Sequence, residues 1–508
     1  MIEPARAANW GLAWPSPARR AHPATGPIRS LPGWLALPAA YLVLAIALRL
    51  TLIANPAVLS DEQFYLLVAD RMRHGALPYV DIWDRKPIGL FLIYRAALAL
   101  PGDPVIGARI VGLVASVATA LTIERMARTI ATPHGARLAG VVYLLFQPVF
   151  NCAIGQSPVF YNLPVALAAA MTLDAARRVE SAALMRRGLV IMVLLGLAIQ
   201  IKYTVIFEGI GLGLVLLARA YADVWSWRRL AGAALCWALV ASCPTLVSFG
   251  TYVAMGHGEA FWQANFLSTL AKASDGDEMW GRLAGQVAAL APFALAMAVA
   301  PRTSEGRTGP LRVLRWWALC AVAGFLALGT WYDHYVGPLL VPFAVLAAPA
   351  LGNDTKPARR AAVLLLAVGA LGSVIVPAIL RSNHGDASDL SRAVALIRPE
   401  LRGRCLYVHD GDPVLYRVSG ACIPTRFAFP AHLDTWVEAR SLGIDPEAEV
   451  RRIMATRPGV VVMGESGSPY LPNLATRRVV SDALARDYER YAGFDIGKSP
   501  YGLYRLRE

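Results

Sequence analysis

The chain has 508 residues, of which 56% are hydrophobic and 17% charged. Its mean hydropathy of +0.46 is too high for an ordinary soluble protein. The net charge of +14 would suit a nucleic-acid-binding protein, but the basic residues are scattered through short loops between apolar segments. This pattern excludes a concentrated basic face and indicates a multi-pass membrane protein that binds no nucleic acid.

The chain begins with a polar segment followed by a long apolar one. Residues 1–33 are rich in Pro, Ala and Arg, and we predict a disordered N-terminus there. The apolar run 34–54 starts too late for a cleavable signal peptide and is long enough to cross a bilayer. We therefore expect it to be the first membrane span.

Two short helices are predicted in the loop 55–103. Ser60 and Gln63 have the spacing of a capping box at the start of the first helix. The second helix is expected to start at Pro87, which is tolerated at the first helical position. Its apolar run 88–100 is shorter than the ~20 residues needed to span a membrane. Both helices are therefore expected to lie on the membrane surface.

Charged residues stand at the start of each of these helices. Asp61 and Glu62 open the first helix, and Arg85 and Lys86 precede the second. A helix N-terminus beside two cations favours an anionic ligand, above all a phosphate. A carboxylate next to a phosphate site is what transfer from a lipid phosphate requires. Alternatively, the acids only complement the helix dipole and the cations only contact lipid headgroups.

The loop resembles the first periplasmic loop of the GT-C glycosyltransferases, especially the family 39-like group of protein O-mannosyltransferases and lipid A aminoarabinose transferases. The resemblance implies a multi-pass membrane enzyme that uses a polyprenyl-phosphate sugar. It also implies that Asp61 is the catalytic acidic residue and that Lys86 contacts the lipid phosphate. The residues that match in order and spacing are Asp61-Glu62, Tyr65, Ala69, Gly75, Pro78-Tyr79, Asp81, Asp84 and Lys86-Pro87.

Several roles remain open for these residues. Asp61 could take the proton of a hydroxyl acceptor, or hold a divalent metal or the sugar in line for displacement. If the acceptor is itself a phosphate, no base is needed and Asp61 would position the substrate. Glu62 could assist, although adjacent helical side chains point about 100° apart, so we expect only one carboxylate to face the reacting carbon. Tyr65, Tyr79, Asp81 and Asp84 are further candidates for the substrate site.

Eleven apolar segments in all are long enough to be considered as spans. A cytoplasmic N-terminus places 21 Arg and Lys residues in inside loops and only two in the short outside loops, which satisfies the positive-inside rule. Residues 382–508 then lie outside, on the same side as Asp61. The segment 188–218 could be one broken helix or a tight hairpin. The ten segments after the first are 104–123, 138–153, 157–176, 188–201, 203–218, 230–254, 283–301, 313–330, 335–351 and 361–380.

Four residues beside or within later spans are site candidates. Lys202 ends a span at the outer face, where it could bind the donor phosphate or simply snorkel. Glu208 could line a donor groove or pair with a neighbouring helix. His334-Tyr335 resembles a family motif, although both residues could instead belong to an interfacial aromatic belt. Many relatives carry an acidic residue near the outer start of the fourth span, and this chain does not.

The composition changes after residue 381, where we predict a small periplasmic α/β domain. Cys405 and Cys422 lie 17 residues apart across turn signals. They are candidates for a disulfide in an oxidising compartment, the alternative being two buried thiols. The predicted helices are 386–397, 446–456 and 481–491, and the predicted strands are 405–408, 459–463 and 501–507.

Together these features predict a mainly α, polytopic protein of the bacterial inner membrane with a GT-C catalytic domain at 34–381. The function implied by the resemblance is inverting transfer of a sugar, a hexose or a pentose, from a polyprenyl-phosphate donor to a periplasmic lipid, glycan or protein. A polytopic transporter or lipid-carrier flippase is the alternative. That class would be expected to show internal repeats, and none is evident in the sequence.

Overall fold

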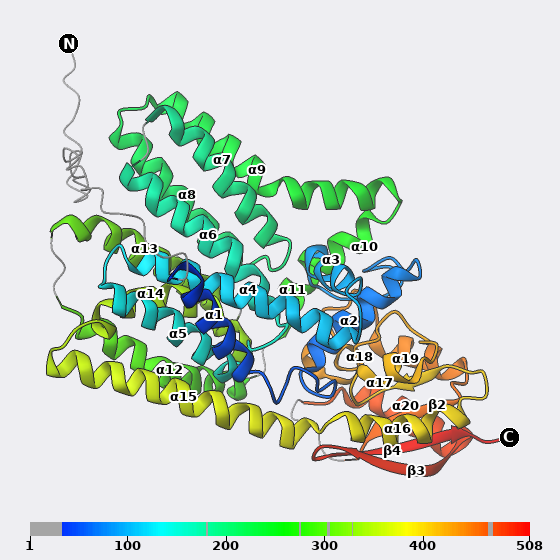
Figure 1. The fold of residues 1–508 in the computed structure, drawn as a ribbon. Coiled ribbons are helices and arrows are strands. Elements are labelled where there is room, and N and C mark those ends of the chain that lie inside the picture. Colours follow the sequence, from blue (N-terminus) through cyan, green and yellow to red (C-terminus); the bar gives the residue numbers. More distant parts are fainter. Residues whose placement is uncertain (1–32, 179–180, 274–275, 302–304, 328, 466–470) are drawn as a thin grey trace.

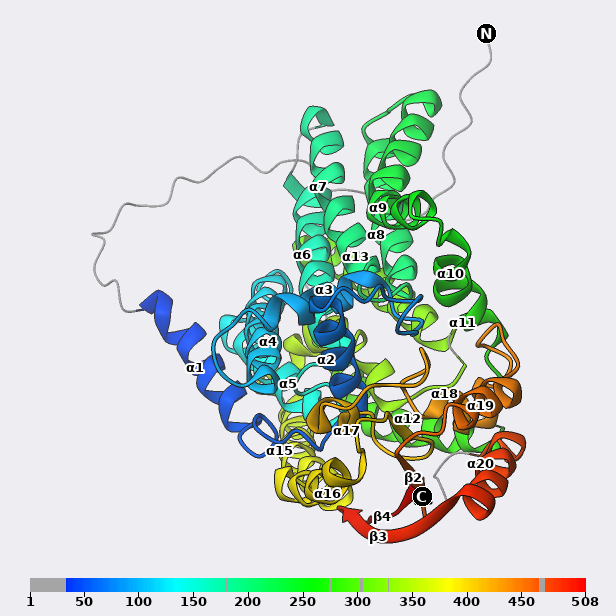
Figure 2. The same cartoon turned by 90° about the vertical axis from the view of Figure 1, so that its right-hand side faces the viewer.

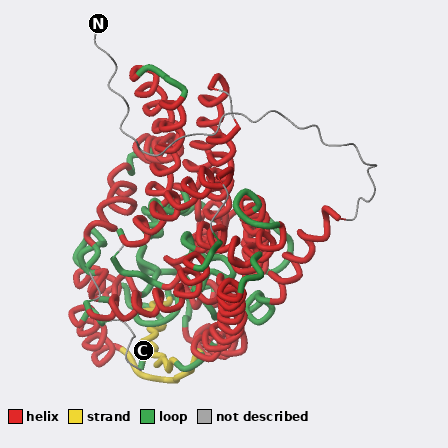
Figure 3. The backbone as a smooth tube through the Cα atoms, turned by 90° about the vertical axis from the view of Figure 1, so that its left-hand side faces the viewer, coloured by secondary structure: helices red, strands yellow, loops and turns green. Residues whose placement is uncertain are grey.

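The computed structural model describes residues 33–178, 181–273, 276–301, 305–327, 329–465 and 471–508. The predicted disordered segment 1–33 therefore lies outside the described residues, except for Gly33. The described chain forms a large helical bundle and a smaller part that contains the strands (Figure 1). Figure 3 shows the strands gathered at one end of the molecule, beyond the helices.

Within the described residues, eleven helices coincide with the eleven apolar segments. α7 and α8 are separate, packed helices, so the segment 188–218 is a hairpin. α5 lies in the middle of the bundle, because it packs against α4, α14 and α15. The helices are α1 (Gly33–Ala47), α4 (Pro104–Ala127), α5 (Pro133–Val149), α6 (Ser157–Arg178), α7 (Ser181–Ile199), α8 (Val205–Ala222), α9 (Trp227–Ala254), α12 (Asp277–Ala298), α13 (Glu305–Leu326), α14 (Leu340–Leu351) and α15 (Lys356–His384).

The eleven helices differ in length and hydropathy, and therefore in whether they could cross a membrane. Six helical segments in the described part of the chain are long and apolar enough to cross a membrane. They are α4, α6, α8, α9, α12 and the segment Lys356–Glu400, which includes α15. The apolar parts of α1 and α14 are shorter. The membrane-protein fold is therefore clear, and eleven crossings remain a prediction.

The loop before α4 contains the two short helices that the sequence predicted, α2 (Ser60–Arg73) and α3 (Ile88–Ala97). They lie between the bundle and the smaller part, and α2 is central when the molecule is viewed from that end (Figure 2). The predicted capping box is wrong. Leu59 is the N-cap, and the Ser60 hydroxyl donates instead to Asp412 Oδ2 at 2.6 Å. Pro87 is likewise the N-cap of α3 rather than its first residue.

Short elements connect the bundle helices at the same end of the molecule. They bring polar residues from distant parts of the sequence toward α2. These elements are α10 (Gly258–Trp262), the π-helical turn η1 (Gln263–Leu267), α11 (Ser268–Ala271) and the 3₁₀ turn η2 (Asp333–Val336).

The smaller part is an α/β domain built on a sheet of order β1-β2-β4-β3, as far as the described residues show. β1 and β2 are parallel, whereas β4 is antiparallel to both of its neighbours. All five residues of β2 are buried, as expected for a central strand covered on both faces. The elements are α16 (Ala387–Glu400), β1 (Leu406–Val408), α17 (Val414–Ser419), α18 (Ala431–Asp434), η3 (Trp436–Glu438), α19 (Pro446–Ala455), β2 (Val460–Gly464), α20 (Leu474–Asp487), β3 (Tyr488–Ile496) and β4 (Ser499–Leu506).

One element of this domain differs from the prediction. The helix expected at 481–491 ends at Asp487, and the chain continues directly as strand β3. β3 forms a hairpin with β4, in which Phe494 faces Tyr501 with ring centroids 5.3 Å apart. At the other edge of the sheet, Cys405 and Cys422 are joined by a disulfide with Cα atoms 4.5 Å apart.

Candidate active site

Asp61 lies in the first turn of α2, where four distant segments of the chain meet. Its Oδ2 accepts a hydrogen bond from Gln156 Nε2 at 3.1 Å. Burial raises the pKa of Asp61, but the charge of Lys86, the neighbouring His334, the Gln156 hydrogen bond and the charge of Lys202 together lower it below its usual value. Asp61 is therefore ionised at neutral pH and is surrounded by positive potential.

Lys86 is the cation that sequence resemblance assigned to the lipid phosphate, and it lies beside Asp61. Its Nζ is 5.6 Å from the centroid of the Tyr65 ring. The Tyr79 hydroxyl donates to the Lys86 carbonyl at 2.9 Å, which holds the backbone in place. Burial lowers the pKa of Lys86, but Asp84 and Asp61 raise it above its usual value. Lys86 therefore remains a cation in this partly buried position.

Lys202 approaches the same site from the turn between α7 and α8. Its Nζ is 4.2 Å from the centroid of the Tyr335 ring, a cation–π contact. The His334 ring packs edge-on against Tyr335, with centroids 4.7 Å apart. Burial lowers the pKa of Lys202, and the charge of Lys86 lowers it further. Lys202, His334 and Tyr335 thus form one wall of the Asp61 site.

Glu208 has the partner on a neighbouring helix that was one of its two predicted roles, and its role in a donor groove stays a prediction. Trp317 Nε1, from α13, donates to Glu208 Oε1 at 2.7 Å, so the buried carboxylate has a partner on a neighbouring helix. Glu208 also lines a narrow pocket together with Lys202, Tyr335 and Tyr161. Lys202 and Tyr335 thus belong both to this pocket and to the surroundings of Asp61.

Arg85 forms an ion pair with a residue of the α/β domain. Its guanidinium is paired with both oxygens of Glu438, and Nη2 donates to Ser441 Oγ at 2.9 Å. Lys272 Nζ lies 3.0 Å from the same Glu438 carboxylate. Burial raises the pKa of Glu438, but the two cations hold it well below its usual range. Arg85 is thus placed as a contact between the two parts of the molecule rather than as an uncommitted phosphate ligand.

Sequence reasoning missed Lys272, Glu438 and Gln156. Lys272 carried a signal, because it was one of two basic residues in the short outside loops. Glu438 and Gln156 carried none, since each acquires its meaning from partners far away in the sequence: Arg85 for Glu438 and Asp61 for Gln156.

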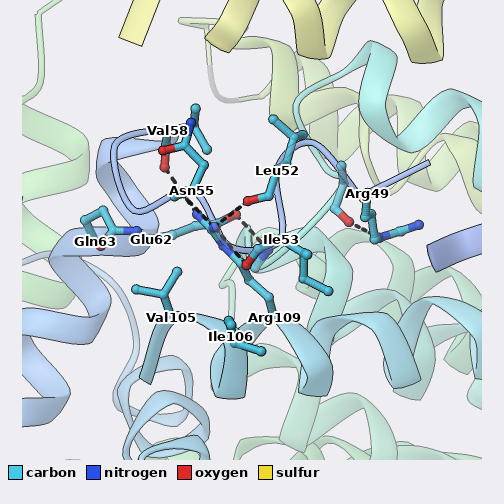
Figure 4. Close-up of polar contacts among 12 residues, drawn as sticks. Arg49, Leu52, Ile53, Asn55, Val58, Glu62, Gln63, Val105, Ile106 and Arg109 are labelled. Atoms are coloured by element: carbon cyan, nitrogen blue, oxygen red, sulfur yellow. Dashed lines mark hydrogen bonds and ion pairs between the residues drawn. The ribbon is translucent and has the colours of Figure 1, made fainter. Parts of the chain in front are cut away.

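Glu62 points away from this cation cluster. Its carboxylate pairs with Arg109 at 3.3 Å and accepts a hydrogen bond from the Gly155 N–H at 2.7 Å. Arg109 also donates to the carbonyls of Leu52 and Asn55, at 2.6 and 2.8 Å (Figure 4). Together, Glu62 and Arg109 fix the turn that leads into α2. This geometry makes Glu62 an anchor for Asp61.

Asp84 and Asp81 have different surroundings. Asp84 is buried and lies close enough to Lys86 to raise the pKa of that lysine. The Oδ1 atom of Asp84 accepts a hydrogen bond from the Arg85 N–H at 2.6 Å. Asp81 is exposed, and its Oδ2 accepts from the Leu77 N–H at 2.7 Å, which closes a local turn. The structure therefore brings Asp84 to the site and leaves Asp81 outside it.

The site has the composition of an anion-binding centre with a carboxylate beside it. Lys86 and Lys202 can neutralise a phosphate, and Asp61 can orient or deprotonate a hydroxyl. Among the residues that the structure describes, no group of three or more His, Cys, Asp and Glu side chains is arranged to hold a metal ion.

Comparisons with known proteins bear on the fold. The model of the dolichyl-phosphate-mannose-protein mannosyltransferase family matches residues 85–247. The structure is similar to that of apo ArnT from Cupriavidus metallidurans, with TM-score 0.64 and 17% identity over 93% of this chain and 98% of that one. The same enzyme bound to undecaprenyl phosphate gives TM-score 0.63 and 16% identity over the same shares.

A more distant likeness is to the oligosaccharyltransferase of Archaeoglobus fulgidus tethered with an acceptor peptide. The TM-score is 0.50 and the identity 12%, over 94% of this chain and 74% of that one. A comparison with the sequences of curated proteins found no match. The chain thus has the membrane fold shared by the GT-C glycosyltransferases.

Proposed function

We propose that this chain, which has the GT-C fold, transfers one sugar from a polyprenyl-phosphate carrier to an acceptor outside the bacterial inner membrane. The observation that best supports this proposal is the meeting of Asp61 with Lys86, Lys202 and His334 in one partly buried site. The similar ArnT structure bound to undecaprenyl phosphate supports a lipid phosphate as the donor class. The family match supports transferase activity in general.

The chemistry follows from the charges. When the bond between sugar and phosphate breaks, negative charge develops on the phosphate, and Lys86 and Lys202 are placed to stabilise it. Asp61 acts on the other side of the anomeric carbon, where it takes the proton of an acceptor hydroxyl or orients the acceptor. Single displacement in this arrangement inverts the anomeric configuration.

The acceptor is a lipid, a glycan or a protein at the outer face of the membrane. This side follows from the predicted topology, in which the loop 55–103 and the α/β domain are periplasmic. The α/β domain then lies against the site on this side of the membrane, because Glu438 contacts both Arg85 and Lys272.

Mass spectrometry of the envelope glycolipids and glycoproteins tests the proposal in cells. A strain without the gene should lose one glycoform. The wild-type gene should restore that glycoform, and a gene carrying Asp61→Asn should not. An unchanged glycan profile in the deletion strain, or restoration by Asp61→Asn, would overturn the proposal.

A further inference from the structure

Gln156 is held between the bundle and Asp61, in the loop immediately before α6. Its side chain is buried, with 4% exposure, and its Nε2 donates to Asp61 Oδ2 at 3.1 Å. An ionised carboxylate can only accept hydrogen bonds, so the amide nitrogen of Gln156 must face Asp61. This requirement fixes the amide orientation and directs Oε1 elsewhere.

Two buried polar atoms near Asp61 have unused hydrogen-bonding capacity. Gln156 Oε1 and the Tyr65 hydroxyl have no hydrogen-bond partner within the described part of the chain. Tyr65 is 1% exposed and lies four residues after Asp61, on the same face of α2. Buried polar atoms in proteins are nearly always paired, and an unpaired one is costly. Two such atoms beside the candidate catalytic carboxylate indicate where a substrate supplies partners.

We propose that Gln156 is a specificity-determining residue whose Oε1 accepts a hydrogen bond from a hydroxyl group of the donor sugar, while its Nε2 positions Asp61. This inference rests on the proposed function. A hydroxyl suits both unpaired atoms, because it can donate to Gln156 and accept from Tyr65, whereas an ammonium group can only donate.

The position of Lys86 assigns this hydroxyl to the donor sugar rather than to the acceptor. Lys86 Nζ lies 5.6 Å from the Tyr65 ring. In the proposed donor, the sugar is bonded directly to the phosphate that Lys86 would bind. The groups around Tyr65 and Gln156 are therefore within reach of the sugar ring when the phosphate is in place.

The test uses the purified full-length chain in lipid nanodiscs. Short-chain polyprenyl phosphates carrying a hexose, a pentose or an amino sugar are first screened for turnover, and the best donor is then compared with its monodeoxy analogues. For wild type, removal of one particular hydroxyl should lower kcat/KM about tenfold or more. In Gln156→Met and in Tyr65→Phe this penalty should shrink, because each substitution removes one of the two partners of the hydroxyl. Gln200→Met, which alters another buried glutamine, should leave the penalty unchanged.

A pH profile separates this role from a purely structural one. Gln156→Glu places a second carboxylate beside Asp61, which raises the pKa of Asp61 and should move the acid limb of kcat/KM to higher pH. The inference is overturned if removal of the sugar hydroxyl lowers kcat/KM as much in Gln156→Met as in wild type. It is also overturned if the substitution changes only the KM for the acceptor.

Failure of the proposed function has a different signature. If wild type turns over none of the donors, the proposed function fails, and this inference fails with it. The second case is that wild type turns over a donor, and that wild type and Gln156→Met bind undecaprenyl phosphate equally tightly. If removal of the sugar hydroxyl then lowers kcat/KM equally in both proteins, the role of Gln156 is refuted and the proposed function stands.

Discussion

Asp61 and Glu62 show how neighbouring carboxylates acquire different roles from their partners. Asp61 faces the cations, whereas Glu62 pairs with the buried Arg109. Replacing Glu62 with Gln leaves the Arg109 charge without its counter-ion. We therefore expect Glu62→Gln to lower the free energy of unfolding by roughly 2 kcal/mol. Thermal denaturation in detergent measures this loss, and Asp61→Asn is the matched control with an unchanged melting temperature.

One outcome of the comparison between Glu62→Gln and Asp61→Asn would contradict this assignment. If Glu62→Gln melts as wild type does but loses as much turnover as Asp61→Asn, then Glu62 shares the chemistry and is not an anchor.

Lys86 is expected to supply much of the affinity for the lipid phosphate. Lys86→Ala removes a point charge facing that phosphate, and we predict about tenfold weaker binding of undecaprenyl phosphate, equivalent to ~1.4 kcal/mol. Lys86→Arg should rescue binding only in part, because its planar fork is larger and directed differently. Affinity measured in detergent is the readout. Unchanged affinity in Lys86→Ala would move the anion site elsewhere, with Lys202 next to be tested.

The lowered pKa of Lys202 makes phosphate binding sensitive to alkaline pH. Lys202 contributes affinity while it is protonated, and that contribution is lost as the pH rises through its pKa, which burial sets below the ordinary value for lysine. Lys202→Arg stays charged throughout and should retain affinity at alkaline pH. On the acid side, the lowered pKa of Asp61 should preserve activity to pH values below the ordinary pKa of an aspartate side chain. Coincident alkaline limbs for wild type and Lys202→Arg would contradict this role.

At the scale of elements, the disulfide stabilises the edge of the α/β domain. Cys405 directly precedes β1, and its bridge to Cys422 closes a loop of 17 residues. Replacing both cysteines with serine should lower the free energy of unfolding by about 3 kcal/mol, because the unfolded chain gains conformational entropy. Thermal unfolding with and without reductant measures the effect, and the double variant should not respond to reductant. Free thiols at both positions in oxidised wild-type protein would refute the bridge.

Elements that depend on local apolar length could be predicted from the sequence, and those that depend on distant partners could not. The eleven apolar segments reappear as helices because each carries its own signal. The capping box at Ser60 failed because Asp412, far along the chain, takes the hydroxyl. Strand β3 was missed because it needs β4 as a partner, and the helical pattern of α20 runs directly into it.

The same distinction applies to the site. Asp61, Lys86, Lys202, His334 and Tyr335 were found by resemblance and by position at the outer ends of helices, and the structure brings these five together. What the sequence could not supply was which charges are already paired. The engagement of Arg85 with Glu438 joins residues 353 positions apart, which no local pattern indicates.

At the scale of the whole molecule, the site belongs to both parts of the fold. The bundle supplies Lys202 and His334, α2 supplies Asp61, and the α/β domain contributes Glu438. The α/β domain also contacts α2 directly, through Asp412 and Ser60. The domain therefore helps to hold the loop 55–103 in the position at which its carboxylate and cations meet.

The central claim is that Asp61 is essential for sugar transfer from a lipid phosphate. The most direct measurement is release of polyprenyl phosphate from a polyprenyl-phosphate sugar by the purified chain in nanodiscs, with wild type and Asp61→Asn compared side by side. We predict that Asp61→Asn lowers turnover at least about a hundredfold while melting temperature and undecaprenyl phosphate affinity stay at wild-type values. Turnover by Asp61→Asn within about tenfold of wild type would contradict the account.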